Sequence, residues 1–126
     1  MNTNQKPIVQ AMFWGALAVV TVLSLLPGDY LPPVAFNVWD KAQHTLGFLV
    51  LGALGLWSYP NKILRVVMGL LIYGAAIELA QAATGWRLGD WQDWLANAVG
   101  VALAYGLRRN AKLTTESTTK PINKAS

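Results

Sequence analysis

Residues 63–83 read ILRVVMGLLIYGAAIELAQAA, an apolar run whose second half contains one carboxylate, Glu78, and one amide, Gln81. A helix that spans a membrane needs about 20 mostly apolar residues, and this run meets that length. The run is rich in Ala, Gly and Leu and lacks period-2 alternation, so a helix satisfies its backbone in lipid better than a strand does. The stretch therefore predicts a membrane-spanning helix with polar groups inside it.

Three further apolar runs share these properties, and together the four runs use most of the 126-residue chain, which is 54% hydrophobic and only 13% charged. The sequence therefore predicts an all-α protein, a membrane four-helix bundle with short loops, formed by one domain at residues 1–107. We expect the first run to be a retained span, because a turn sequence follows it in place of a signal-peptide cleavage site. The absence of cysteine excludes disulfides and thiol chemistry. The expected spans are 8–26, 42–59, 63–83 and 91–107.

The basic residues predict the orientation. If all four runs span, only Lys41 and Arg87 lie on one side, and the remaining Lys and Arg residues lie on the other. The positive-inside rule then predicts a multi-pass protein of the inner (cytoplasmic) membrane with both termini in the cytoplasm. Residues 108–126, basic and rich in Thr and Ser, are expected to form a flexible cytoplasmic tail. The net charge of +4 marks cytoplasmic ends, so we expect no nucleic-acid partner.

Polar residues within or beside the spans converge on one level. The second and fourth helices run inward, so their polar first residues lie near the outer boundary. The third helix runs outward, so its polar last residues lie at the same level. Small residues on the same helical stripes, such as Gly74, Gly100 and Ala104, allow close helix approach and turn the polar groups inward. The expected ligand-binding residues are Asp40, Lys41, His44, Glu78, Gln81, Arg87, Asp93 and Asn97.

These residues also carry a family resemblance. The chain resembles VanZ-like membrane proteins, a bacterial family whose pattern Asp-Lys-x-x-His-x-x-x-Phe appears here at residues 40–48. The family's Glu-x-x-Gln appears at residues 78–81, and its Arg and Asp-x-x-x-Asn appear at Arg87 and residues 93–97. The resemblance implies a small integral membrane protein of the cell envelope. The family takes its name from a component associated with low-level resistance to the glycopeptide teicoplanin, and resistance itself is not carried over to this chain.

Three functions remain open at this point. The outer pocket could recognise the polar head of an envelope lipid or glycan, or a glycopeptide-like molecule, which is the preferred hypothesis. The chain could instead be a membrane enzyme, with Glu78 or Asp93 as general base and His44 as its acid or partner. It could also be a structural or accessory protein, in which His44 bonds Glu78 or Asn97 only to lock helices together.

Carboxylates outnumber cationic side chains on the predicted outer side, which opposes a phosphate-only ligand and better suits a sugar, an amine or a divalent cation. No local ligand motif supports a metal, so we expect neither a metal nor another cofactor. The lipid bilayer is an expected partner. A homo-oligomer is left open, with Gly15, Gly69 or Gly106 on packing faces.

Overall fold

The computed structural model describes residues 5–27, 38–86 and 89–119, with side chains described from residue 41 in the second segment and up to residue 115 in the third. Within these ranges the chain forms four α-helices and no strand. The predicted all-α four-helix bundle is therefore confirmed. The helices are α1 (Gln5–Leu25), α2 (Val38–Ser58), α3 (Ile63–Thr84) and α4 (Trp91–Thr119).

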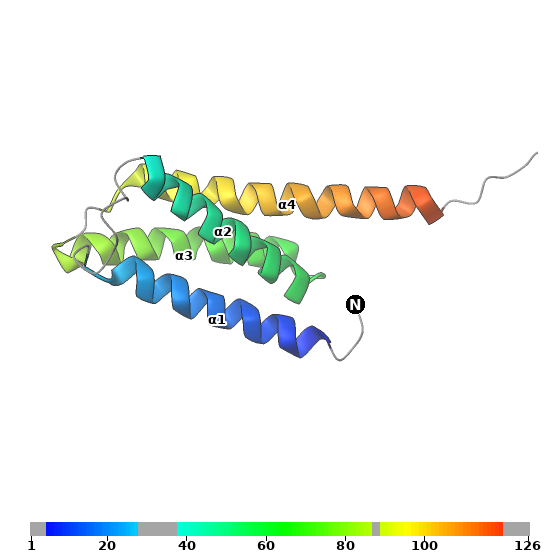
Figure 1. Cartoon of the computed structure of the whole chain (residues 1–126), viewed down its shortest axis with the longest axis horizontal. Helices are drawn as coiled ribbons and strands as arrows, with labels where there is room; N and C mark the ends of the chain where they lie inside the picture. Colours follow the sequence, from blue (N-terminus) through cyan, green and yellow to red (C-terminus); the bar gives the residue numbers. More distant parts are fainter. Residues whose placement is uncertain (1–4, 28–37, 87–88, 120–126) are drawn as a thin grey trace, which may run out of the picture.

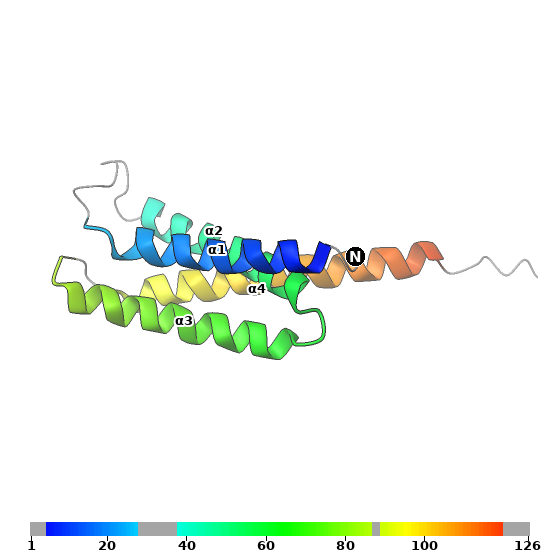
Figure 2. The same cartoon turned by 90° about the horizontal axis from the view of Figure 1, so that it is seen from below.

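The helices run up and down, and α2 crosses between α1 and α4 (Figures 1 and 2). The contact of α2 with α4 is the most extensive in the bundle, while α1 packs on α2 and α3 and makes no contact with α4 among the described residues. The first turns of α2 and α4 and the last turn of α3 lie at the same end. The turn between α2 and α3 lies at the opposite end, beyond which α4 projects (Figure 1).

Three of the four helices follow the predicted spans within a few residues, but α4 is longer than predicted. It continues to Thr119 through a segment that the sequence predicts as a flexible tail. The side chains of residues 109–115 are exposed, and Thr114 and Thr115 donate hydrogen bonds to carbonyl oxygens one turn earlier. The segment lacks apolar residues for a core, yet a helix satisfies its backbone without one.

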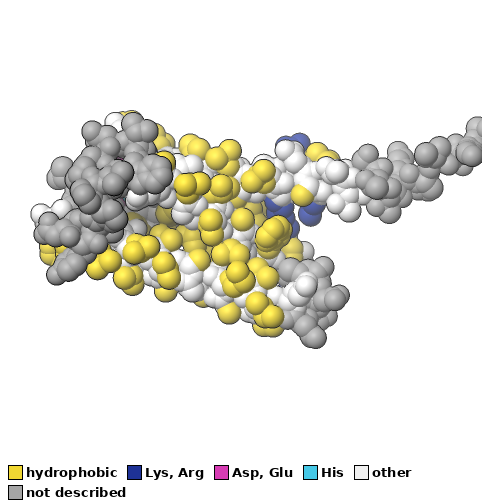
Figure 3. Space-filling view, viewed as in Figure 1, with side chains coloured by type: hydrophobic (Ala, Val, Ile, Leu, Met, Phe, Trp, Pro, Cys, Tyr) yellow, Lys and Arg dark blue, Asp and Glu magenta, His cyan; other side chains and the backbone are white. Residues whose placement is uncertain are grey.

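The bundle exposes much of its apolar surface. Its core is a narrow cluster around Phe48, Leu51 and Val101, whereas large hydrophobic side chains such as Val19 and Ile72 point outward. Figure 3 shows hydrophobic side chains over the visible face of the bundle. Within the described residues, two helices, α1 and α3, are long and apolar enough to cross a membrane. An apolar surface this extensive suits a lipid environment better than water.

Two glycines set the distance between α2 and α4. A Cβ added to Gly52 of α2 would lie 2.7 Å from the Cβ of Ala104, and a Cβ added to Gly100 of α4 would meet the backbone carbonyl oxygen of Thr45. Such contacts are closer than real side chains tolerate, so the two backbones approach as closely as they do only because both positions lack a side chain. The predicted packing role of Gly100 and Ala104 is confirmed. Gly52, which lies against Ala104, has the same role.

We predict that Gly100→Ala lowers the free energy of unfolding by about 1–3 kcal/mol, because the new methyl group must push α2 and α4 apart. Thermal unfolding of the detergent-solubilised chain measures the effect. Gly106→Ala on the same helix is the matched control, since a Cβ there meets no atom within 4 Å. Equal melting temperatures for the two variants would contradict the close approach.

Candidate functional site

Three helices bring polar side chains together at the end of the bundle where α2 and α4 begin. His44 of α2 donates a hydrogen bond from Nδ1 to Oδ1 of Asn97 on α4 over 3.0 Å. The same Nδ1 lies 3.7 Å from Oε1 of Glu78 on α3, beyond normal hydrogen-bond distance but within strong electrostatic reach. The side chains of His44 and Glu78 are each only 9% exposed. We call His44, Glu78 and Asn97 the polar floor.

Glu78 is also held by the segment that leads into α4. Its Oε2 accepts a hydrogen bond from the backbone N–H of Asp90 over 3.2 Å. The approach depends on Gly89, because a Cβ at that position would meet the backbone carbonyl oxygen of Glu78. The carboxylate of α3 thus takes part in fixing where α4 starts.

Above the polar floor, Lys41 joins α2 to the start of α4. Its Nζ donates to Oδ1 of Asp93 over 3.1 Å and to Oδ2 of Asp90 over 3.5 Å. Lys41 and Asp90 are 40% and 38% exposed, whereas Asp93 is buried. Lys41 and Asp90 therefore form a rim that is open to the surroundings.

Asp90 has a second role as the N-cap of α4. Its Oδ1 accepts a hydrogen bond from the backbone N–H of Gln92 over 2.9 Å, which satisfies a donor that the first turn of a helix leaves unpaired. Asp93 lies in the same first turn, where a negative charge interacts favourably with the helix dipole. Asp90 is not among the eight predicted ligand-binding residues, although its three-residue spacing from Asp93 places both on one face of a helix.

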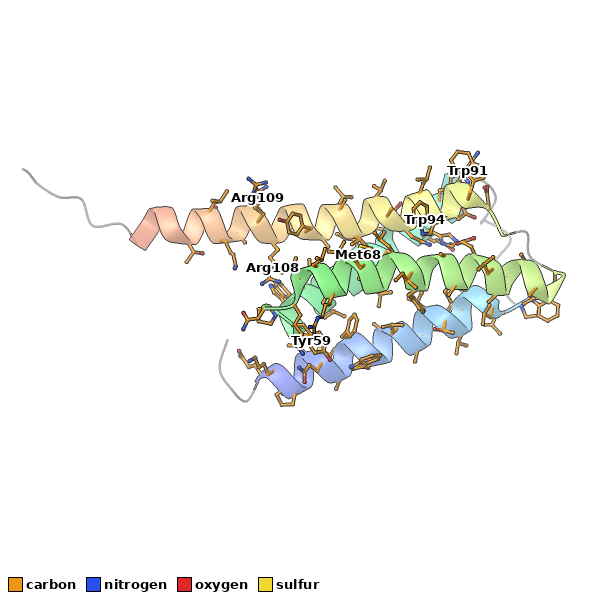
Figure 4. The ribbon with its side chains drawn as sticks, turned by 180° about the vertical axis from the view of Figure 1, so that it is seen from behind. Tyr59, Met68, Trp91, Trp94, Arg108 and Arg109 are labelled. Carbon is orange, nitrogen blue, oxygen red and sulfur yellow. The ribbon has the colours of Figure 1, made fainter. Side chains whose placement is uncertain are left out.

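Two neighbouring hydrogen bonds, which the sequence reasoning missed, fix α4 against α2 and α3. Thr45 donates to the carbonyl oxygen of Ala96, and Nε1 of Trp94 donates to the carbonyl oxygen of Leu71 over 3.0 Å. Figure 4 shows Trp94 directed toward α3 and Trp91 directed away from the bundle. Thr45 directly follows His44 in the chain, but periodicity alone does not reveal a bond to a backbone carbonyl.

The structure brings together five of the eight predicted site residues: Lys41, His44, Glu78, Asp93 and Asn97. Gln81 is buried but turns toward α1, where its Nε2 donates to the carbonyl oxygen of Ser24 over 2.9 Å. It therefore ties α3 to α1 and is not joined to the other five by a hydrogen bond. The side chain of Asp40 and all of Arg87 lie outside the described residues.

Comparison with protein families decides the classification. The VanZ/LLP1 family model matches residues 5–112, which include all four helices except the end of α4. The chain belongs to the VanZ/LLP1 family. No curated protein and no solved structure matches the chain. Membership of the VanZ/LLP1 family and the two apolar helices together indicate a membrane protein.

The chemistry of the polar end in this VanZ/LLP1 chain is that of hydrogen bonding and charge. Among the described residues, three carboxylates (Glu78, Asp90 and Asp93) stand with one ammonium and one imidazole. Within the described residues no three His, Asp or Glu side chains are grouped as metal ligands would be. Nδ2 of Asn97 is buried and has no hydrogen-bond partner among the described residues, so the floor retains one unused donor.

We predict that Lys41→Gln and Asp93→Asn each lower the melting temperature, because Lys41→Gln leaves the buried Asp93 without its cationic partner and Asp93→Asn leaves Lys41 only its longer pair with the more exposed Asp90. The double variant should recover part of the loss, since the buried position then holds no charge. A double-mutant cycle of thermal unfolding in detergent measures the coupling. Lys112→Gln is the control, because Lys112 is an exposed cation on the same helix as Asp93 and forms no salt bridge among the described residues. Strictly additive losses would show that the two side chains do not interact.

Proposed function

We propose that this VanZ-like chain crosses the cytoplasmic membrane four times, with both termini in the cytoplasm and the polar floor near the outer face. The helices α1 and α3 are apolar enough to cross alone. The polar first turns of α2 and α4 face each other through Lys41–Asp93 and His44–Asn97, which removes these groups from lipid. Lys62, Arg65 and Arg109 belong to the opposite end, as the positive-inside rule requires.

The absence of native cysteine allows a direct test of the topology. A cysteine at exposed Gln92 should react with a membrane-impermeant maleimide in intact cells, because Gln92 lies in the first turn of α4 at the outer face. A cysteine at exposed Lys112 should react only after the membrane is permeabilised. The reverse labelling pattern, or labelling of both positions in intact cells, would contradict the proposed orientation.

We further propose that the polar end recognises a polar group of an envelope lipid, or of a glycopeptide-like molecule. The observation that carries this proposal is that buried polar side chains lie beneath partly exposed charged ones. A buried floor with an unused donor at Asn97, which is 1% exposed, lies beneath the half-open Lys41–Asp90 rim. A ligand acceptor that reaches this amide would satisfy a buried donor whose lack of a partner costs about 1–3 kcal/mol.

The charge of the polar end defines the class of ligand. Among the described residues of the polar end, three carboxylates stand with one lysine, a charge balance that opposes a phosphate and favours an amine. An incoming ammonium can take the place of Lys41 between Asp90 and Asp93, while hydroxyl groups of a sugar can bond the imidazole and the amide below. The preferred ligand is therefore an amine-bearing or sugar-bearing headgroup.

One feature of the floor supports a second function, that of an enzyme. The imidazole of His44 lies against the carboxylate of Glu78, and such a pair can move a proton to or from a bound substrate. This alternative uses His44, which is also proposed to bond the ligand, and adds Glu78 as its partner in proton transfer. Turnover of a bound lipid by the wild-type chain would distinguish an enzyme from a binding protein.

We predict that Glu78→Gln weakens binding of teicoplanin, a glycopeptide that carries both sugars and an amine, by about tenfold or more. A hydrogen bond to a charged group contributes roughly 1.5–3 kcal/mol, and the amide removes that charge with little change of shape. Isothermal titration of the full chain in phosphatidylcholine nanodiscs measures the affinity, and nanodiscs with phosphatidylethanolamine test competition by an amine-bearing lipid.

Tyr73→Phe is the matched control, because it also removes buried hydrogen bonds from α3, those of the Tyr73 hydroxyl with Thr21 and Leu17 of α1, away from the floor. If Tyr73→Phe lowers the melting temperature as much as Glu78→Gln but keeps binding, the floor is a binding site. If wild type binds neither teicoplanin nor phosphatidylethanolamine and both variants only unfold earlier, the layer is a scaffold and the proposal fails.

A further inference from the structure

A groove runs between α1 and α3 toward the end of the bundle that is opposite the polar floor. It has a volume of about 420 Å³, within the roughly 300–1,000 Å³ that ligand pockets occupy. We call it the α1–α3 groove. Its lining residues come from α1, from α3 and from the turn that precedes α3, and six that matter here are Phe13, Leu17, Tyr59, Lys62, Arg65 and Gly69.

The walls of the α1–α3 groove are apolar. Phe13 and Leu17 of α1 face Val66 and Leu70 of α3 across it. The helices diverge toward this end in both views of the ribbon (Figures 1 and 2). Gly69 leaves room in the wall, because a Cβ added there meets no atom within 4 Å. The groove is therefore suited to a flexible hydrocarbon and not to a polar molecule.

The mouth of the groove is cationic. Lys62 and Arg65 line it and are exposed, and among the described residues neither forms a salt bridge. The hydroxyl of Tyr59, which accepts a hydrogen bond from Nε1 of Trp14 over 3.1 Å, lies at the same place between α1 and α3 (Figure 4). The first turn of α3 carries no acidic residue and no side-chain cap. Its N–H groups thus add to the positive potential.

We propose that the α1–α3 groove binds an anionic glycerophospholipid, with one acyl chain between the helices and the phosphate against Lys62 and Arg65. The charge at the mouth selects the occupant, since two free cations beside an apolar channel complement a lipid whose anionic head is joined to a hydrocarbon chain. This site is separate from the polar floor, and it rests only on the chain being embedded in a membrane. Failure of ligand recognition at the floor would leave it intact.

The test is lipid retention by the purified full chain, measured by native mass spectrometry after exposure to equimolar phosphatidylglycerol and phosphatidylcholine. Wild type should retain phosphatidylglycerol preferentially. The double variant Lys62→Gln/Arg65→Gln should lose most of that preference, by about fivefold for each cation removed. Both side chains are exposed, so the melting temperature should not change.

The matched charge control is Arg109→Gln/Lys112→Gln, which removes two exposed cations from α4 outside the groove. Arg109 points away from the bundle in Figure 4. Gly69→Leu should fill the groove and reduce retention of both lipids, while Gly106→Leu, at an equally open position on α4, should leave retention unchanged.

Two results would overturn the proposal. Equal loss of preference in both double variants would mean that general surface charge, and not the groove, attracts the lipid. Unchanged retention in Gly69→Leu would mean that no acyl chain occupies the space between α1 and α3.

Discussion

The backbones of α2 and α4 approach closely at two positions, Gly52 against Ala104 and Gly100 against Thr45, and the hydrogen bonds between these two helices depend on this approach. A side chain at Gly100 would collide with the backbone of α2 around Thr45. In the turns of α2 and α4 beside this contact, His44 reaches Asn97 and Thr45 donates to the carbonyl oxygen of Ala96. The close approach of α2 and α4 thus allows both the tight backbone packing and the hydrogen bonds between the two helices. In lipid, where apolar surfaces gain little from meeting, small residues and interhelical hydrogen bonds are the two available sources of helix association.

The polar groups in turn explain the unequal character of the helices. Within the described residues α1 and α3 pass as apolar spans, and α2 and α4 do not. The difference lies in the first turns of α2 and α4, which contain Lys41 and Asp93. These charges are directed at each other, so the outward surfaces of both helices remain apolar, as Val50 and Val99 illustrate. A hydropathy average treats all sides of a helix alike and therefore underrates a helix whose polar residues occupy its contact face.

The sequence predicts the helices and the convergence of His44, Glu78 and Asn97, because both follow from apolar length and helical spacing. The sequence could not predict the hydrogen-bond partner of Gln81. This residue is three positions after Glu78 and lies far enough around α3 for its side chain to contact α1. The sequence treats Arg108 only as a topology signal, yet its guanidinium donates to the carbonyl oxygens of Leu56 and Pro60 at the end of α2. Such bonds to backbone carbonyls leave no sequence pattern. The sequence does not predict the length of α4, because a segment with few large apolar residues shows no apolar periodicity even where its backbone forms a helix.

The two ends of the bundle carry opposite charge, and this has consequences for what each can bind. Among the described residues, three carboxylates lie with one lysine at the polar floor and its rim, while the α1–α3 groove opens beside Lys62 and Arg65. A ligand that suits one end is repelled by the other, so the two proposed sites do not compete for one molecule. With the proposed orientation, an anionic lipid would enter from the inner leaflet and an amine-bearing headgroup from the outer. Arg108 connects the ends, because it fixes α4, which carries Asp93 and Asn97, to the turn that forms the mouth of the groove. A change that stabilises this turn would therefore help to hold α4 in the axial position that the polar floor requires.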